Sequence, residues 1–418
     1  MTNRNVHRKR ERCRICGNRE LWCFLSLGPS PLANAFLESP DAFDAEPFFP
    51  LDVYLCTECG LVQLLDVIDP EVLFRDYIYV TGTSATMAEH NRRYAEHVVE
   101  LLELTPDDLV VEVASNDGSL LKHFAARGIR VLGVEPARNI ASLARSAGIE
   151  TVDEFFNAPV ATGLRAEYGP AKAVIADNVL AHVDDTRDFL VGCRTLLAPD
   201  GLVVIEVPYL GDLLDRLEYD TVYHEHLCYF SVSALMRACE AAGLSVRRIE
   251  HLEVHGGSLR LFAGLWDRQP AHSREAQEWA ERESRLGLTS CDRYRRFASE
   301  VEENRRSLRA LLEKLCDKGM RLAAYGAPAK GNTLLNYCRI GPDILEFVVD
   351  KNEMKVGRYT PGRHIPVLPV SVVLERQPDY LLILPWNIAE EIMRQQSEYQ
   401  RRGGRFILPI PEPRVVEP

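Results

Sequence analysis

The strongest constraint on the fold is a strand, a tight turn and a second strand that ends in an acid. Residues 110–120 (VVEVASNDGSL) join an apolar run to a turn at Gly118, and GVEP at 133–136 closes the second strand. Gly118 lets backbone approach a ligand, and Glu135 is placed to accept hydrogen bonds from two ribose hydroxyls. The pattern predicts a nucleoside-binding half of a doubly wound α/β sheet, and this pairing suits S-adenosylmethionine.

An ordinary buried strand and turn is the alternative, because Ala114, Ser115 and Asn116 stand where dinucleotide folds often carry glycine. A second cue favours a ligand site. Residues 173–182 (AVIADNVLAH) form another apolar run that ends in polar groups, and residues 201–208 (GLVVIEVP) follow as a further strand. Polar groups that follow parallel strands meet at the carboxyl edge of the sheet, where ligands of such folds bind.

Composition limits the class of protein. A chain of 418 residues exceeds what one hydrophobic core usually serves, so we expect two or three domains in a fully globular chain. It contains no run of about eighteen apolar residues, and its basic N-terminus lacks the apolar stretch of a secretion signal. We therefore expect a cytoplasmic protein without a membrane partner. The net charge of −12 argues against a general nucleic-acid binder.

Two Cys-x-x-Cys pairs, each followed directly by glycine, indicate a metal site. The pairs are Cys13 with Cys16 and Cys56 with Cys59. In such knuckles two thiolates converge on one metal, and two knuckles complete a closed tetrahedral site. The spacing predicts structural zinc. Redox-active pairs are the weaker alternative, because the flanks do not resemble a βαβ unit. The remaining cysteines, Cys23 among them, are expected to be small buried side chains.

These anchors divide the chain into three parts. We expect a zinc-binding ribbon domain over residues 1–70, a nucleoside domain with a helical lead-in over 71–255, and a C-terminal domain over 256–418. Residues 273–318 are dense in charge and have helical spacing with opposite-sign neighbours. This stretch predicts a solvated pair of connecting helices that carries no chemistry.

The strand, glycine loop and helix pattern starts again at residues 321–333 (RLAAYGAPAKGNT), with further strands at 345–350 and 380–385. It predicts a second Rossmann-like unit. Backbone N–H groups of the loop could hold a pyrophosphate, with Lys330 adding positive charge, although a plain tight turn is the alternative. Two nucleoside-type folds suggest one for the methyl donor and one for a nucleotide-bearing substrate.

The segment YHEHL at 223–227 is the most reactive-looking cluster. A zinc-peptidase helix needs H-E-x-x-H, which this is not. If the segment is helical, Tyr223 and His226 share a face while His224 points elsewhere. An imidazole beside a tyrosine can transfer protons at neutral pH, and Glu225 could orient a neighbour. A set of structural histidines is the alternative.

The sequence resembles a known family, the zinc-containing, S-adenosylmethionine-dependent nucleotide-sugar C-methyltransferases, which include the carbon-3 methyltransferases of deoxysugar pathways. The resemblance covers nearly the whole chain. It is carried by CRICG (13–17), LGPSPLAN (27–34), CTECGLVQ (56–63), EVASNDGSL (112–120), YHEH (223–226), HGGSLR (255–260) and YGAPAKGN (325–332).

This resemblance implies a zinc domain, a class I methyltransferase domain and a C-terminal Rossmann-like domain, acting on a dTDP-linked 4-keto-deoxysugar. A base would remove the proton next to the ketone, and the enolate would take the methyl group on carbon 3. By the family pattern the catalytic residues are His226 as base, with Tyr223, Glu225, His182 and Tyr77 around the sugar. Simple packing is the alternative for Tyr77. Tyr223 or a protonated His182 could donate to the enolate, and the zinc would be structural.

Placement along the strands suggests the binding residues. Glu135 is expected on the ribose, Gly118 and its neighbours near the methionine part, and Glu154 with Phe155 around adenine. The methyl-donor candidates are Glu112, Ser115, Asn116, Gly118, Glu135, Glu154, Phe155 and Asn178. The candidates for the nucleotide sugar are Lys330 and Asn332, with Arg260 as a phosphate or a structural partner.

Rival functions remain at this stage. An O-methyltransferase acting on a sugar or another small acceptor would use the same base without an enolate. A more distant alternative is a zinc-ribbon scaffold or sensor that binds the donor without turnover. Methylation at carbon 5, the sugar's substituents, the pathway and the oligomeric state are left open by the sequence.

Overall fold

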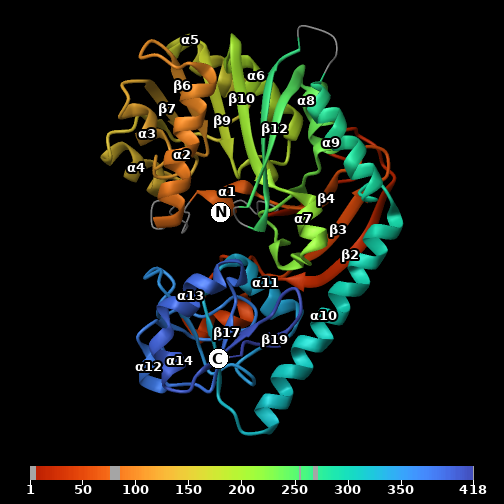
Figure 1. Ribbon diagram of the computed structural model, residues 1–418, viewed down its shortest axis with the longest axis vertical. Coiled ribbons are helices and arrows are strands. Elements are labelled where there is room, and N and C mark those ends of the chain that lie inside the picture. Colours follow the sequence, from red (N-terminus) through yellow and green to blue (C-terminus); the bar gives the residue numbers. More distant parts are fainter. Residues whose placement is uncertain (1–5, 76–84, 254–255, 267–271, 418) are drawn as a thin grey trace.

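A computed structural model of the chain describes residues 6–75, 85–253, 256–266 and 272–417. A seven-stranded sheet occupies one end of the molecule and a six-stranded sheet the other, with the strands of the zinc-binding part between them (Figure 1). Among the described residues, no helix is long and apolar enough to cross a membrane.

The zinc-binding part consists of short antiparallel strands. Strands β2, β3 and β4 belong to a four-stranded sheet, while β1 pairs with β5. Gly17 and Gly60 follow the cysteine pairs with φ of 73° and 76°, the left-handed conformation that glycine adopts most easily. The elements are β1 (His7–Lys9), β2 (Leu21–Ser30), η1 (Pro40–Ala45), β3 (Phe49–Cys56), β4 (Val62–Leu64), β5 (Asp66–Ile68) and α1 (Pro70–Phe74).

The seven-stranded sheet has the order β12-β13-β10-β9-β6-β7-β8, with β13 antiparallel to its neighbours. The strand order reverses between β6 and β9, which is the point where doubly wound sheets bind ligands. Its elements are α2 (Ala85–Leu102), β6 (Leu109–Val113), α3 (Leu121–Ala125), β7 (Arg130–Val134), α4 (Arg138–Ser146), β8 (Thr151–Val152), α5 (Ala158–Tyr168), β9 (Ala171–Asp177), η3 (Leu180–His182), α6 (Thr186–Leu196), β10 (Leu197–Pro208), α7 (Leu210–Asp215), η4 (Tyr219–Thr221), α8 (Val232–Ala241), β12 (Leu244–Leu252) and β13 (Ser258–Leu265).

Local sequence explains where several helices begin. The side chains of Asn157, Asp185, Ser231, Ser273 and Ser290 each accept a hydrogen bond from a backbone N–H in the first turn of the helix that follows. Such caps satisfy donors that the helix itself leaves unpaired, each worth about 1 kcal/mol.

Strand β11 (Cys228–Tyr229) leaves the part of the chain that forms the seven-stranded sheet and completes the zinc-binding sheet, whose order is β11-β4-β3-β2. Cys228 pairs with Gln63 and Tyr229 with Val62. The last strand of the zinc-binding sheet therefore lies immediately after the YHEH segment, and the two parts share one sheet.

Helices α9 (Arg274–Arg285) and α10 (Cys291–Asp317) confirm the predicted connecting pair. The expectation that the pair is simply solvated is wrong for α10, because one face of this helix is buried. Its buried side chains recur at helical spacing and include Tyr294, Phe297, Val301, Leu308 and Leu312. Figure 1 shows α10 running along one side of the molecule past all three parts.

The C-terminal sheet has the Rossmann-like order β16-β15-β14-β17-β18-β19, parallel except for β19. It confirms a second Rossmann-like unit. One apolar core extends from the zinc knuckles through the seven-stranded sheet into this unit. The elements are β14 (Leu322–Tyr325), α11 (Ala329–Tyr337), β15 (Val348–Asp350), β16 (Val367–Pro369), α12 (Val372–Arg376), β17 (Tyr380–Ile383), η6 (Trp386–Ile388), α13 (Ala389–Gln395), α14 (Ser397–Arg401), β18 (Arg405–Leu408) and β19 (Arg414–Val415).

Candidate active site and zinc centre

Glu135 lies at the end of β7 with its carboxylate fixed by backbone. One oxygen accepts a hydrogen bond from the Asn116 N–H (2.9 Å) and the other from the Ala137 N–H (2.8 Å). Burial raises the pKa of Glu135, and these two donors act in the opposite direction. The carboxylate is held rigid and keeps lone pairs for further donors such as ribose hydroxyls.

The loops around this carboxylate hold unusual backbone conformations. Ala114, Asn116 and Asn178 have φ of 57°, 50° and 52°, in the left-handed region that non-glycine residues rarely adopt. Such strain persists where surrounding structure enforces it, often in ligand sites. Gly118 has φ of 74°, and a Cβ there would lie 2.9 Å from the side chain of Ile149. Position 118 therefore requires glycine for both its conformation and its space.

Several carboxylates lie on the strands next to the loop at residues 114–118. Glu112 on β6 is buried, and its pKa is raised by burial and by the nearby charges of Asp177, Glu135 and Asp117. Burial and the charge of Glu206 likewise raise the pKa of Asp177 at the end of β9. The raised pKa values favour the neutral forms of these acids, and a cation placed beside them would stabilise their charged forms. This coupling suits a cationic ligand such as a sulfonium ion.

The remaining predicted donor contacts differ in exposure. Ser115 is buried against Gly133, where any Cβ would collide with the serine hydroxyl. Glu154 is exposed, whereas Phe155 is half-buried with the guanidinium of Arg75 4.6 Å from its ring centre. The Arg75 guanidinium therefore already covers one face of the Phe155 ring, so an adenine could stack only on the other face.

A buried polar network joins α2, β10 and β13, and sequence reasoning missed most of it. Glu206 is fully buried and accepts from Nε and Nη2 of Arg260 (3.0 and 2.6 Å), while its other oxygen lies 3.2 Å from Nε2 of His90. Arg260 also stacks 3.5 Å from the ring centre of Tyr94. Ligand atoms of His90, Asp177 and Glu206 lie within 4.8 Å of one another, but the Arg260 guanidinium already supplies the positive charge there. The one sequence signal was an acid inside an apolar strand.

The YHEH segment forms a turn, closed by a hydrogen bond from the His226 N–H to the Tyr223 carbonyl, so the helix considered as one condition above is not formed. The turn still brings the two side chains together. Nε2 of His226 lies 2.7 Å from the Tyr223 hydroxyl, and Nδ1 lies 2.9 Å from the Thr221 carbonyl oxygen. A carbonyl only accepts, so Nδ1 carries the proton and the tyrosine O–H donates to Nε2. His224 points away and binds the Pro50 carbonyl.

Burial lowers the pKa of His226 to about 4, so near neutral pH this imidazole is uncharged and can accept a proton. His182 in η3 lies beside it, with ring centres 5.0 Å apart. Burial and the proximity of His226 lower the pKa of His182 well below its usual value. The sequence suggested a protonated His182; the neutral imidazole favoured here can still donate through its single N–H.

Glu225 is buried in the same turn, and its carboxylate accepts from the side-chain amide of Asn34 at 2.7 Å. Lys355 of the C-terminal part lies close enough to Glu225 for the carboxylate to raise the pKa of the lysine, although burial lowers it overall. The Lys355 ammonium also donates a hydrogen bond to the Ala327 carbonyl at 2.9 Å. Sequence reasoning missed both Asn34 and Lys355, although Asn34 closes the quoted LGPSPLAN motif. Tyr77 lies outside the residues that the structure describes.

The predicted nucleotide-sugar residues fall into two groups. Lys330 in the first turn of α11 binds Asn387 and lies 4.3 Å from the ring centre of Trp386. Burial lowers the pKa of Lys330, although Asp220 and a second acid nearby oppose this effect. Asn332 is buried and donates to the Ala33 carbonyl at 2.7 Å, so it joins two parts of the chain. The third candidate, Arg260, belongs instead to the seven-stranded sheet.

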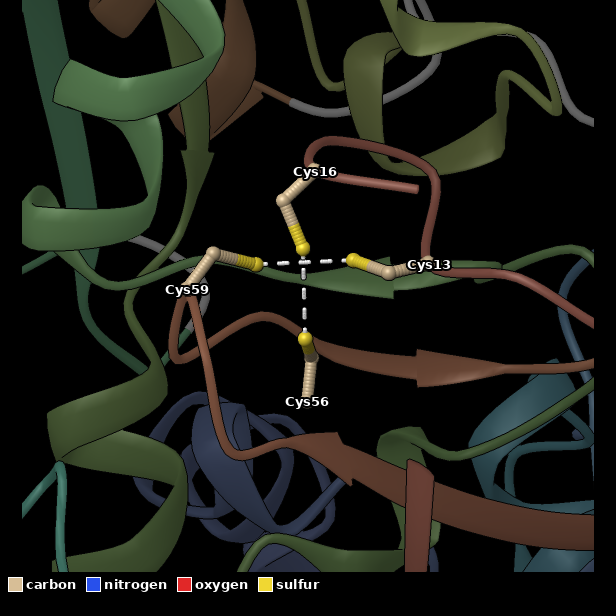
Figure 2. Close-up of side chains that lie close together, drawn as sticks. All are labelled: Cys13, Cys16, Cys56 and Cys59. Carbon is tan, nitrogen blue, oxygen red and sulfur yellow. Dashed lines mark hydrogen bonds between the residues drawn. The ribbon is translucent and has the colours of Figure 1, made fainter. Parts of the chain in front are cut away.

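The two cysteine knuckles converge as the spacing predicts. Sγ of Cys13 lies 3.4 Å from that of Cys59, and Sγ of Cys16 lies 3.5 Å from that of Cys56. Figure 2 shows the four side chains pointing at one common centre. Zinc–thiolate bonds of about 2.3 Å in a tetrahedron place sulfurs roughly 3.8 Å apart, so this set fits a zinc ion. All four positions are filled by protein ligands, as in structural sites.

The other cysteines only partly match their prediction. Four of them are buried: Cys193, Cys228, Cys239 and Cys338. Cys23 is exposed on strand β2, so the expectation of burial is wrong there. Alternate residues of a strand point to opposite faces, and Cys23 lies on the face away from the core.

Comparison with known proteins covers the whole chain. Family models match a zinc binding domain at residues 13–74, a methyltransferase domain at 87–249 and a C-methyltransferase C-terminal domain at 253–411. The C-methyltransferase NovU of Streptomyces niveus is 39% identical over 412 residues, which cover 99% of this chain and 98% of that protein.

Two further similarities concern only part of the chain. A ubiquinone biosynthesis O-methyltransferase of Chromobacterium violaceum is 26% identical over 157 residues, covering 34% of this chain and 66% of that protein. The crystal structure of magnesium protoporphyrin IX methyltransferase from Synechocystis with bound SAM is 15% identical with a TM-score of 0.35, covering 47% of this chain and 97% of that one.

Proposed function

The chain belongs to the C-methyltransferase family and is an S-adenosylmethionine-dependent methyltransferase with a zinc-binding domain, and from this premise we propose that it methylates carbon 3 of a dTDP-linked 4-keto-deoxysugar. The observation that carries the proposal is the neutral, buried His226 beside Tyr223. S-adenosylmethionine supplies a methyl group on a sulfonium, which is already a good leaving group. The protein must therefore create and orient a carbon nucleophile.

His226 is suited to make that nucleophile. Its Nδ1–H is anchored by the Thr221 carbonyl, which leaves the Nε2 lone pair directed at the Tyr223 hydroxyl. Substrate binding would turn this lone pair to the proton on carbon 3. The proton moves to Nε2, the C–H electrons form the enolate, and the new carbon–carbon bond forms as the methyl–sulfur bond breaks. Holding both reactants in line supplies roughly 7–11 kcal/mol of the barrier.

Negative charge develops on the ketone oxygen and needs donors. The Tyr223 hydroxyl and the N–H of a neutral His182 lie beside the base and would be these donors. Removing one donor of this kind typically costs about 2.7–4 kcal/mol. Glu225, held by Asn34, would fix the turn that carries both Tyr223 and His226.

The nucleotide end of the substrate requires cations. Lys330 and Lys355 belong to the C-terminal Rossmann-like part. The charge of Lys330 interacts with that of Asp220, three residues before the YHEH turn, and the charge of Lys355 interacts with that of Glu225 within the turn. Two lysine ammonium groups match a diphosphate carrying about two negative charges. We assign them to the diphosphate of the nucleotide sugar, with the sugar ring over the turn.

Mass spectrometry in deuterated water tests the proposal. The purified enzyme is given S-adenosylmethionine and a panel of dTDP-4-keto-6-deoxysugars, and wild type is compared with His226→Asn. We expect a methyl group on carbon 3 and, without donor, deuterium on the same carbon. The variant should lose both reactions while binding S-adenosylmethionine as before.

His224→Asn is the matched control, since this neighbouring histidine binds Pro50 and points away from the base. Methylation without carbon-bound deuterium would favour an oxygen acceptor and contradict the enolate. No turnover across the panel would contradict the sugar class, and full activity of His226→Asn would contradict the assigned base.

A further inference from the structure

Arg14 stands inside a zinc knuckle, between Cys13 and Cys16, and its side chain is completely buried. Its backbone N–H and its Nη1 donate to the Gln63 side-chain oxygen at 3.3 and 3.2 Å, and Nη1 also donates to the Leu64 carbonyl. Nη2 lies 3.1 Å from a carboxylate oxygen of Asp184. One guanidinium thus joins two segments that are far apart in the sequence.

Each of those segments leads to one histidine of the active site. Asp184 follows His182 by two residues, directly after η3. Gln63 and Leu64 belong to β4, which pairs with β11, and the Leu64 N–H donates to the Leu227 carbonyl at 2.9 Å, next to His226. Arg14 therefore connects the segment that carries His182 to the strand that holds the segment of His226. The two imidazole ring centres are 5.0 Å apart.

The chemistry of the contact favours a geometric role. Burying a guanidinium is costly unless its donors are satisfied, and a buried ion pair stabilises the fold less than its distance suggests. In Arg14, Nη1 makes the hydrogen bonds, Nη2 meets Asp184 as an ion pair without hydrogen-bond geometry, and Nε has no hydrogen-bond partner among the described residues. Such a planar, rigid fork can hold these groups in one arrangement, which a lysine ammonium cannot. Arg8 and Arg10 also contact Asp184, but both are more exposed than Arg14. Arg10 also links the two regions, because its backbone N–H donates to the Leu65 carbonyl at 2.8 Å. Among these three side chains, that of Arg14 is the one that bonds to β4 itself.

We propose that Arg14 is a positioning residue for the methyl-transfer site: from the zinc knuckle it sets the spacing of His182 and His226. The zinc ligands on either side fix its backbone, so the metal centre stabilises the catalytic turn through this side chain. The roles of the two histidines rest on the proposed function. The spacing itself does not, because it can be observed without substrate.

The test uses Arg14→Met and Arg14→Lys, with Arg8→Met as matched control because it removes an exposed arginine from the same carboxylate. Zinc content, the histidine side-chain NMR resonances of ¹⁵N-labelled enzyme, and kcat and KM are measured. We expect Arg14→Met to keep its zinc, to shift the resonances of His182 and His226, and to lower kcat by about 100-fold with KM little changed. Arg14→Lys should recover only part of kcat, and Arg8→Met should match wild type.

Asp184→Asn provides a second route, since it weakens the same contact from outside the knuckle. It should move the same two resonances even if Arg14→Met loses zinc or folds poorly. Unshifted histidine resonances in the folded variants would overturn the proposal, as would shifted resonances with an unchanged kcat. If no dTDP-ketosugar is turned over by wild type, the proposed function fails, while the NMR comparison still decides whether Arg14 sets the spacing.

Discussion

At the scale of single residues, we expect the protonation of His226 to set the pH range of the proposed reaction. Its pKa is lowered by burial from 6.5 to about 4, so the ring loses its proton at lower pH than a free histidine. The basic form should therefore persist down to about pH 5. We predict that deuterium exchange into the ketosugar is level from pH 7 to 5 and falls through pH 4. An acid limb centred near 6.5 would contradict this assignment; circular dichroism at each pH checks that the protein stays folded.

Glu135 offers a second test at this scale. Replacing it by glutamine removes the charged acceptor of both the Asn116 and Ala137 N–H groups: one of them meets a neutral oxygen and the other faces an NH2 donor. Hydrogen bonds to charged groups contribute about 1.5–3 kcal/mol each. We predict that Glu135→Gln weakens S-adenosylmethionine binding by roughly 10- to 100-fold in calorimetry. The control is Glu150→Gln, since Glu150 is exposed and binds the Tyr168 hydroxyl; equal losses in both variants would remove the special role of Glu135.

At the scale of elements, the turn between β6 and α3 depends on one glycine. Gly118 and Gly128 have similar φ of 74° and 78°, but only at position 118 would a Cβ meet another side chain, that of Ile149. A left-handed alanine costs roughly 1–2 kcal/mol. We predict that Gly128→Ala loses about that much unfolding free energy in urea, whereas Gly118→Ala loses more and also binds the methyl donor less tightly. Equal losses of unfolding free energy in the two variants would contradict this prediction, because they would show that Ile149 moves aside at no cost.

Elements defined by local patterns could be predicted from the sequence, and elements defined by distant partners could not. The strand and turn before Gly118, the cysteine knuckles and the second Rossmann-like unit follow from periodicity and spacing. The two-residue strand β11 carries no periodic signal, because it forms only against β4. The buried face of α10 was hidden by its many charges, which occupy the opposite face.

The candidate site shows the same division. Spacing brought out Glu135 and the pair of Tyr223 and His226, which meet in a turn and not on a helix face. Asn34 and Lys355 come from other parts of the chain and meet Glu225 only after the parts assemble. Local sequence patterns cannot predict these contacts, because the contacts depend on how separate sheets pack together.

At the scale of the whole molecule, strand β11, which follows the candidate YHEH turn, belongs to the zinc-binding sheet, so loss of the metal should alter the turn. We predict that Cys56→Ser, which removes one ligand, loses zinc and speeds hydrogen exchange of residues 221–229 by at least about tenfold. The strand β17 lies in the six-stranded sheet and serves as internal control. Exchange of 221–229 that stays at the wild-type rate in zinc-free protein would contradict the coupling. Metal content is measured on the same samples.

The shared strand also affects how the chain is made. Until Tyr229 has left the ribosome, β4 presents an unpaired edge, because its partner β11 has not yet been synthesised. At about 5–20 residues per second this interval lasts roughly ten to thirty seconds, long enough for an open edge to pair with another nascent chain. Zinc binding early in synthesis would fold the cysteine knuckles, but it would leave the edge of β4 unpaired until β11 is made. Yield in the cell should therefore respond to translation rate between residues 64 and 229, even when the finished enzyme is unaltered.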